Sequence, residues 1–509
     1  MTGLHLEHRK RAFEPLSLIW VAITACGTSL PPVTLIPDPP DAAVSFTPEQ
    51  TDGLSIVVST DLNGQLVGDD PLREGLLGWS GRVDRVPEPK LLLDNGDAWN
   101  GGSVSNVLQG RPVREVFELM GVQAVNLGNH EFDRGQDDLR SLESRFRLLS
   151  CNLRMGGRSP DYAEPFVVLH EAGFKVGVVG LQSETLPQRT RVRHTEGLTV
   201  LPAEQVLKSC VSDARGAGAE VVVVLYHEDP AKVRRFMLKV DLAGVDLVVA
   251  SDRQPGFHTR IKGIAMVQPG GLGRSVAVAR FVRDPRGVRL NRLWLEDGRY
   301  DPPPEVARVI LHAQREAARV LDASVGTAPT NLAVGDFHQS PLGQFTAQAW
   351  LAAVPDADVA LLNHGALRHP LIQGPVSEAQ LRDALPFDDE LVLVTLTGAQ
   401  LREALTKAPV AGGFRWSYTV DQKGIRPLSV VHQDGYSVEE DRSLQVLMPE
   451  FLAEGGDDFP LEQYPRRPTG VRMRAPVREA LASQAPLNRN TLAPRATFVS
   501  RAHARSRPR

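Results

Sequence analysis

The sequence has few cysteines, a nearly balanced charge and no long apolar run. Only three Cys occur in 509 residues, Cys26, Cys151 and Cys210, and their spacing fits neither a metal site nor a disulfide framework. The formal net charge of −4 gives no reason to expect a nucleic-acid partner. With 42% hydrophobic and 23% charged residues, the chain has the composition of a globular protein, and its length predicts one to three domains.

The N-terminal 50 residues have the pattern of an export signal. Arg9, Lys10 and Arg11 precede "LSLIWVAITA", an apolar run of about ten residues that is too short to span a bilayer but suits a secretory signal. The run ends in "ITAC", which resembles a bacterial lipobox with Cys26 as the acylated residue. The alternative is an uncleaved helix with a chance cysteine. We expect an exported protein, anchored to a bacterial membrane through Cys26 and facing the periplasm or the cell surface.

The rest of the chain divides into segments of different composition. We expect a signal peptide at 1–25, a Pro-rich tether at 26–50, a first domain at 51–300 and a linker helix at 301–322, opened by a Pro cluster. A second, smaller domain at 323–475 and a basic, disordered tail at 476–509 follow. We expect no partner for the tail, because a solvated tail is the favoured explanation of its composition.

Short valine-rich runs recur through the first domain. They include "LSIVVS" (54–59), "KLLL" (90–93), "VQAVNL" (122–127), "KVGVVGL" (175–181), "EVVVVLY" (220–226) and "VDLVVA" (245–250). Such runs are apolar without strict alternation, which is typical of strands buried on both faces in a layered α/β protein. In the second domain, "DADVALLN", "ELVLVTLTG" and "LQVLMPE" predict strands and "AQLREAL" predicts a helix. The fold class is therefore α/β.

Polar residues follow five of these runs at their carboxyl ends, where open α/β sheets place their sites. A single loop acid is usually a cap or turn residue, but five in order, two of them with histidine, indicate a site for divalent metals. Gly96 and Gly128 should let the backbone turn sharply there. The residues are Asp61, Asn63, Asp94, Asp97, Asn129, His130, Asp133, His227, Glu228, Asp229, Asp252 and Gln254.

The order of "STDLNGQL", "DNGDAWNGG", "LGNHEFDRG", "VVVLYHED" and "VVASDRQPG" resembles the calcineurin-like metallophosphoesterase superfamily. The second half, with "VALLNHGALRHPLIQGPVSEAQLRDALPF" and "EFLAEGGDDF", is similar to the C-terminal domain of secreted 5′-nucleotidases and UDP-sugar hydrolases. The resemblance covers residues 51 to 475. It implies a four-layer α/β/β/α N-terminal domain joined to a smaller α/β domain.

The resemblance also implies an activity, the hydrolysis of phosphomonoesters by a hydroxide held between two divalent ions. Asp97 would bridge the ions, and His130, oriented by Asp133, would act on phosphate or leaving group. The implied metal ligands are Asp61, Asn63, Asp97, Asn129, His227, Asp252 and Gln254. The implied substrate is a small phosphate ester, in particular a nucleotide, bound by Asn363, Arg368, Phe451 and Asp457.

Two motifs depart from the family pattern. Asn63 and Asp252 stand where the family has histidines, so the ligand set is richer in oxygen and favours Mn²⁺ or Mg²⁺ over Zn²⁺. Arg253 could repel a cation or clamp a phosphate, and the sequence leaves both open. A second base-stacking aromatic is expected just before the "GG" turn, where Ala408 and Pro409 stand; Phe414 is a candidate substitute. The alternative function is a non-catalytic binding lipoprotein on the same scaffold.

Overall fold

A computed structural model of the protein describes residues 53–483, except 69, 252–254, 286, 339 and 423, together with residues 496–499. The predicted signal peptide, the tether, Cys26, Asp252, Arg253 and Gln254 lie outside the described residues. Within them, no helix is both long enough and apolar enough to cross a membrane.

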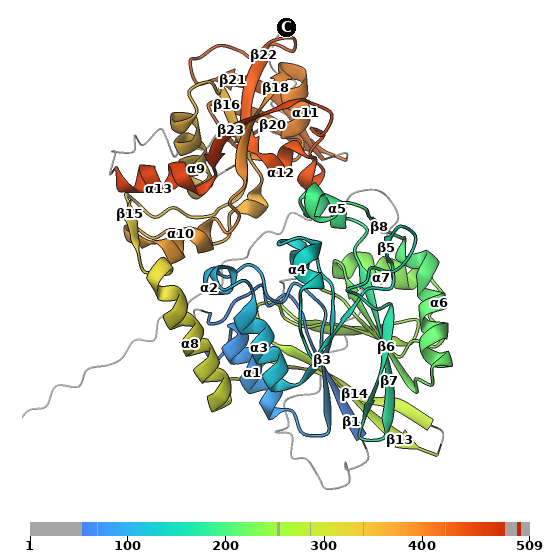
Figure 1. The fold of residues 1–509 in the computed structure, drawn as a ribbon. Helices are drawn as coiled ribbons and strands as arrows, with labels where there is room; N and C mark the ends of the chain where they lie inside the picture. Colours follow the sequence, from blue (N-terminus) through green and yellow to red (C-terminus); the bar gives the residue numbers. More distant parts are fainter. Residues whose placement is uncertain are drawn as a thin grey trace, which may run out of the picture.

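Two β-sheets form the centre of the N-terminal domain (Figure 1). The first has the order β14 (Gly287–Glu296), β13 (Val276–Asp284), β1 (Gly53–Ser59), β2 (Lys90–Asp94), β3 (Val122–Asn126) and β4 (Arg147–Leu149). The second has the order β11 (Phe257–Ile261), β12 (Ile264–Gln268), β10 (Leu247–Val249), β9 (Val221–His227), β7 (Phe174–Gln182) and β6 (Phe166–Glu171). Strands β1, β2 and β3 are parallel to one another, as are β7, β9 and β10.

The two sheets pack face to face and helices cover their outer faces. Leu54, Ile56 and Leu91 of the first sheet share one core with Val178 and Val223 of the second. On the outer face of the first sheet lie α1 (Gly75–Arg85), α3 (Arg111–Met120) and α8 (Pro304–Leu321), and on that of the second α6 (Ala203–Gly216) and α7 (Pro230–Lys239). The predicted α/β/β/α layering is confirmed, because the valine-rich runs are strands buried on both faces.

The C-terminal domain contains a mixed sheet between two hydrophobic cores. Its strand order is β19 (Val410–Gly412), β16 (Val359–Leu362), β22 (Ser443–Pro449), β18 (Glu390–Thr397) and β23 (Arg466–Arg472). One core includes α9 (Pro341–Ala353), α10 (Glu378–Ala384) and α13 (Arg474–Ala482). The other includes α11 (Gly398–Leu405) and a sheet of β21 (Gly424–His432), β20 (Phe414–Asp421) and β24 (Ala496–Phe498). The strands and the helix predicted here are confirmed.

Shorter elements complete the described chain. Two small sheets pair β5 (Leu153–Met155) with β8 (Leu198–Val200) and β15 (Ser324–Ala328) with β17 (Gly374–Ser377). The short helices are α2 (Ser103–Val107), α4 (Gln136–Arg140), α5 (Leu186–Arg189) and α12 (Glu450–Ala453). The 3-10 turns are η2 (His130–Phe132), η3 (Val192–His194), η4 (His364–Ala366) and η5 (Gly456–Asp458).

Two sequence expectations were wrong. A disulfide bond joins Cys151 to Cys210 of α6, although no disulfide was expected from their spacing. The segment predicted to be a disordered tail also contains regular structure, because residues 476–482 belong to α13 and residues 496–498 form β24 beside β20. Trp416 of β20 pairs with Ala496 of β24, so part of the segment completes a sheet.

Candidate metal and phosphate site

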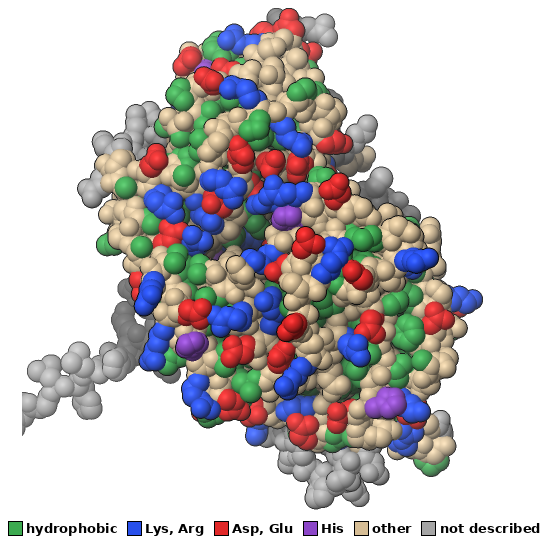
Figure 2. Space-filling model, viewed as in Figure 1, with side chains coloured by type: hydrophobic (Ala, Val, Ile, Leu, Met, Phe, Trp, Pro, Cys, Tyr) green, Lys and Arg blue, Asp and Glu red, His purple; other side chains and the backbone are tan. Residues whose placement is uncertain are grey.

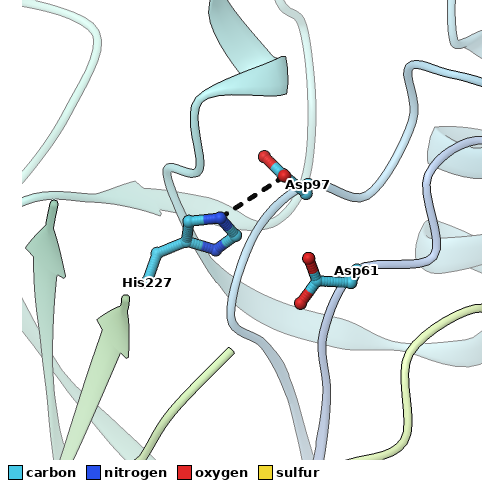
Figure 3. A group of neighbouring side chains, drawn as sticks. All are labelled: Asp61, Asp97 and His227. Carbon is cyan, nitrogen blue, oxygen red and sulfur yellow. Dashed lines mark ion pairs between the residues drawn. The ribbon is translucent and has the colours of Figure 1, made fainter. Parts of the chain in front are cut away.

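The carboxyl ends of β1 and β2 in the first sheet and of β9 in the second meet at one edge of the N-terminal domain. Asp61 follows β1 and Asp97 follows β2 in the first sheet, whereas His227 ends β9 in the second. One ligand atom from each of these three buried residues lies within 4.8 Å of the others (Figure 3). His227 Nε2 is 3.4 Å from Asp97 Oδ2. Two carboxylates and one imidazole form a donor set suited to borderline or hard divalent cations.

The electrostatics of these residues also fit a cation. Burial alone raises the pKa of the Asp97 carboxyl, but His227 and His130 outweigh burial and hold this pKa well below its usual range. Burial lowers the pKa of His227, yet Asp97 outweighs it and raises that pKa to about 10. His227 Nδ1 donates to the Asn95 carbonyl at 2.7 Å, so Nε2 is the nitrogen available to a metal. The residues present therefore fit a divalent ion.

Glycines permit the close approach of these loops. A Cβ on Gly128 would lie 2.3 Å from Asp97 Oδ1 and 2.8 Å from His227 Cε1, so only glycine fits. Gly96 has a φ of +94°, as the sharp turn before Asp97 requires. Asp61 and Asp97 have φ values of 51° and 55°, an uncommon conformation for these residues that often marks a functional site.

Glu131 holds the two loops that carry Asp97 and Gly128. Its carboxylate accepts hydrogen bonds from the backbone N–H groups of Asp97 (2.7 Å), Ala98 (2.8 Å) and Gly128 (2.7 Å). Burial and the charge of Asp97 raise its pKa to about 7. No role was predicted for Glu131. Its place in "GNHEFD" was the available signal, but its partners are backbone groups that the sequence does not reveal.

His130 and Asp133 lie as the resemblance implied for a His–Asp pair. His130 Nδ1 is 2.9 Å from Asp133 Oδ2, and His130 Nε2 is 3.9 Å from Asp97 Oδ2. Burial lowers the pKa of His130, but Asp133 and Asp97 outweigh it, so this pKa is raised overall. The backbone N–H of His130 also donates to Asp97 Oδ1 at 2.8 Å. The imidazole is therefore fixed in orientation and favours its protonated form.

The remaining predicted metal ligands differ in position. Asn129 lines the same cavity as Asp61, Asp97 and His227. Asn63 is buried nearby, and its side-chain amide donates to the Asp61 carbonyl at 3.0 Å. Asn63 does not line that cavity but faces a smaller neighbouring one, beside Arg368. Asp252 and Gln254 lie outside the described residues, as noted above.

The cavity over the metal group lies between the two domains and has a volume of about 380 Å³. We call it the first cavity. Its lining residues are Asp61, Asp97, Asn129, His130, Arg189, His227, Glu228, Asp229, Ser251, Asn363, Gly365, Arg368, Phe387, Phe451 and Asp457. All four substrate-binding residues predicted in the C-terminal domain are therefore brought to the same space as the metal group.

Contacts within the C-terminal domain hold three of these four residues, Asn363, Phe451 and Asp457. Asn363 Nδ2 donates to Asp457 Oδ2 at 2.7 Å. The Phe451 ring lies against Gly456, where a Cβ would come within 2.5 Å of the ring. Burial raises the pKa of Asp457, while the hydrogen bond from Asn363 and the charges of Arg189 and Arg368 partly oppose the increase.

Phe387 is the second aromatic of the cavity; it ends the run "LRDALPF", but no role was predicted for it. It stacks on His130 with ring centroids 6.1 Å apart, and the Arg368 guanidinium carbon lies 5.7 Å from its centroid. The proposed substitute, Phe414, is completely buried in the C-terminal core and lines no part of the cavity. The first cavity is therefore lined by two aromatic rings, Phe387 and Phe451, although Ala408 and Pro409 stand before the "GG" turn.

Two buried amides join the sheets beneath the site. Asn95 Nδ2 lies 3.3 Å from the carbonyls of both Tyr226 and Val249, at the ends of β9 and β10. Asn126 Nδ2 donates to Asn95 Oδ1 and to the Leu181 carbonyl, each at 3.0 Å. These bonds link the ends of β2 and β3 to three strands of the second sheet.

Comparison with known proteins finds a family match within the second half of the chain. Residues 321–463 match the family described as "5′-nucleotidase, C-terminal domain". The chain also superposes on the crystal structure of a 5′-nucleotidase precursor from Thermus thermophilus with a TM-score of 0.76 and 20% identity, covering 88% of this chain and 99% of that one. The predicted resemblance, with a nucleotidase C-terminal domain after a layered N-terminal domain, is confirmed.

Two curated relatives are longer proteins than this chain. Endonuclease YhcR of Bacillus subtilis is 22% identical over 400 residues, which are 71% of this chain and 33% of the relative. Cell wall protein Lmo0130 of Listeria monocytogenes is 23% identical over 438 residues, 70% of this chain and 55% of the relative. The chain thus spans a third to about half of these proteins. At these identities the comparisons establish the fold, and residues 321–463 match the nucleotidase C-terminal family.

Proposed function

We propose that the protein is a metal-dependent phosphomonoesterase of the 5′-nucleotidase type. One observation carries this proposal. Asp61, Asp97 and His227 bring three ligand atoms within 4.8 Å of one another in a cavity whose opposite wall is formed by the nucleotidase C-terminal domain. A cation site facing an arginine and two aromatic rings suits an anionic phosphate on an aromatic leaving group.

Asp61, Asp97 and His227 would hold the cation, together with Asn129 and, as proposed from the sequence, Asn63, Asp252 and Gln254. Divalent ions in such a site supply Lewis-acid polarisation of a phosphate ester, and the oxygen-rich set favours Mn²⁺ or Mg²⁺. Glu131 keeps the loop amides of Asp97 and Gly128 in place, so the ligand positions are preorganised.

His130 would carry the proton that the leaving oxygen requires. Asp133 accepts from Nδ1, which leaves Nε2 to hold a proton toward the cavity. Arg368 would bind phosphate oxygens, for which a guanidinium is well suited. Phe387 and Phe451 would stack on a nucleobase, and the bonded pair of Asn363 and Asp457 would contact the sugar.

The test is phosphate release by residues 27–509 with Mn²⁺, Mg²⁺ or Zn²⁺, from nucleotides, nucleotide sugars and 4-nitrophenyl phosphate. Asp97→Asn should abolish release and lower the bound metal, and His130→Ala should lower the rate strongly while leaving the metal bound. Asp246→Asn is the matched control, because this carboxylate pairs with Arg215 away from the site. Activity that survives in Asp97→Asn contradicts the mechanism.

A binding protein without catalysis is the competing proposal. It is favoured by the Asn63 amide, which bonds to the Asp61 carbonyl instead of lining the first cavity. It predicts no phosphate release with any metal and no metal bound after purification.

We also propose that the protein is exported and anchored through Cys26. The Cys151–Cys210 disulfide supports an oxidising compartment, since such bonds are rare in the bacterial cytosol. The basic residues, apolar run and lipobox-like "ITAC" support the route.

A further inference from the structure

A second cavity of about 280 Å³ adjoins the first and lies between the same two domains. Arg189, Asn363, Phe387 and Phe451 line both cavities, so the two meet at the aromatic pair. A ligand whose phosphate lies over the metal group can therefore extend past these rings into the second cavity. Only a phosphate ester with a large leaving group reaches that far.

One wall of the second cavity comes from a segment of the N-terminal domain, residues 186–194, which we call the α5–η3 segment. It includes α5 and η3 with Thr190 and Arg191 between them, and α5 lies at the junction of the two domains (Figure 1). Charged side chains of both signs crowd this junction on the face in Figure 2.

Ion pairs hold the α5–η3 segment on the C-terminal domain. Arg191 pairs with Asp389, and Arg193 Nη1 lies 3.6 Å from Glu450 Oε2. The Arg191–Asp389 pair lines the second cavity itself, so it fixes the residue next to Thr190 against the opposite wall. These ion pairs therefore hold the chain next to Thr190 against the domain that carries Phe387 and Phe451.

Thr190 is only 4% exposed, lines the second cavity, and its hydroxyl has no hydrogen-bond partner among the described residues. A buried hydroxyl without a partner costs stability, so such groups are usually satisfied by a protein group, a water or a ligand. The neighbouring Thr195 differs, because its hydroxyl lies 3.4 Å from the Val192 carbonyl and it lines neither cavity.

We propose that Thr190 is a specificity-determining residue that hydrogen-bonds the leaving group of the substrate in the second cavity. The group it selects is planar enough to stack on Phe387 and Phe451 and has a polar edge, which describes the base of a nucleoside monophosphate. This inference rests on the proposed function. It adds that the N-terminal domain, and not only the C-terminal domain, binds and selects the leaving group.

The experiment compares Thr190→Val, which replaces the hydroxyl by a methyl group of similar shape, with Thr190→Ser and Thr195→Val. Thr190→Val should lower kcat/KM for AMP and UMP about tenfold, the value of one hydrogen bond, and change kcat/KM for 4-nitrophenyl phosphate less than about twofold. Thr190→Ser should restore most of the loss, and Thr195→Val should spare the ratio between nucleotide and aryl phosphate.

Stability gives an independent readout. Because the hydroxyl has no partner among the described residues, ligand-free Thr190→Val should melt at the same temperature as the parent protein or above it. A lower melting temperature with equal losses for nucleotide and aryl phosphate indicates a structural residue and overturns the proposal.

Adenosine binding, measured by calorimetry, separates this inference from the proposed function. Thr190→Val should weaken adenosine binding about tenfold even if no substrate releases phosphate, in which case the proposed activity fails and the recognition role stands. Unchanged adenosine affinity in Thr190→Val, with phosphate release intact, overturns the recognition role and leaves the proposed activity standing.

Discussion

Glu131 should be a large single contributor to the stability of the site, although it faces no substrate. Its side chain is completely buried and accepts from three backbone N–H groups. In Glu131→Ala these three donors lose their acceptor at once. A buried donor left without a partner costs about 1–3 kcal/mol, and water entering the space limits the sum, so we expect a loss of about 3–6 kcal/mol.

Glu131→Gln gives a graded comparison. One carboxylate oxygen accepts from both Asp97 and Gly128, and the other accepts from Ala98 alone. The glutamine carbonyl can take the first position, which leaves the Ala98 N–H facing an amide NH₂. The expected loss of stability is therefore about 1–3 kcal/mol, because one donor loses its acceptor instead of three.

The assay is urea unfolding of the full chain in chelator, read by hydrogen exchange of peptides covering residues 90–135. Local exchange is needed because a two-domain chain does not unfold in one step. Glu118→Gln is the control, since this surface carboxylate accepts a single backbone bond, from Arg145 at 3.2 Å, and should change stability by less than about 0.5 kcal/mol. A loss below about 1 kcal/mol in Glu131→Ala, or equal losses in both Glu131 variants, refutes the reasoning.

Three further predictions concern the approach of the loops, the aromatic pair and export. Gly128→Ala places a Cβ 2.3 Å from Asp97 Oδ1, so it should weaken metal binding about tenfold or more, as measured by calorimetry. The control Gly216→Ala, in α6 with open space around it, should leave metal binding unchanged. Phe387→Leu should raise KM for nucleotides about tenfold relative to 4-nitrophenyl phosphate, and equal effects on both would exclude base stacking. Cys26→Ser should move the protein from the membrane to the soluble fraction, and unchanged fractionation contradicts the lipobox interpretation.

The strands of the fold could be predicted from the sequence because burial on both faces leaves a local signal. The run "EVVVVLY" and the strand Val221–His227 illustrate this, since each residue of that strand is buried. The edge where Asp61, Asp97 and His227 meet could be predicted for the same reason, because parallel strands place their carboxyl ends together.

What the sequence did not reveal depends on contacts between distant segments. Phe387 meets His130 across the domain junction, and the sequence does not show which residues face each other there. Glu131 acts on backbone N–H groups, which every residue except proline carries. Cys151 and Cys210 are 59 residues apart, and only the packing of α6 on the second sheet brings them together.

The ligand group lies on a seam rather than within one sheet. Asp61 and Asp97 belong to the first sheet and His227 to the second, and Asn95 ties the two sheets at the same edge. A cation held by all three side chains is therefore also a cross-link between the two sheets, each of which is covered by its own helices. Metal affinity should then depend on how well the sheets dock, so a substitution deep in their shared core, such as Ile56→Ala, should weaken metal binding without touching a ligand.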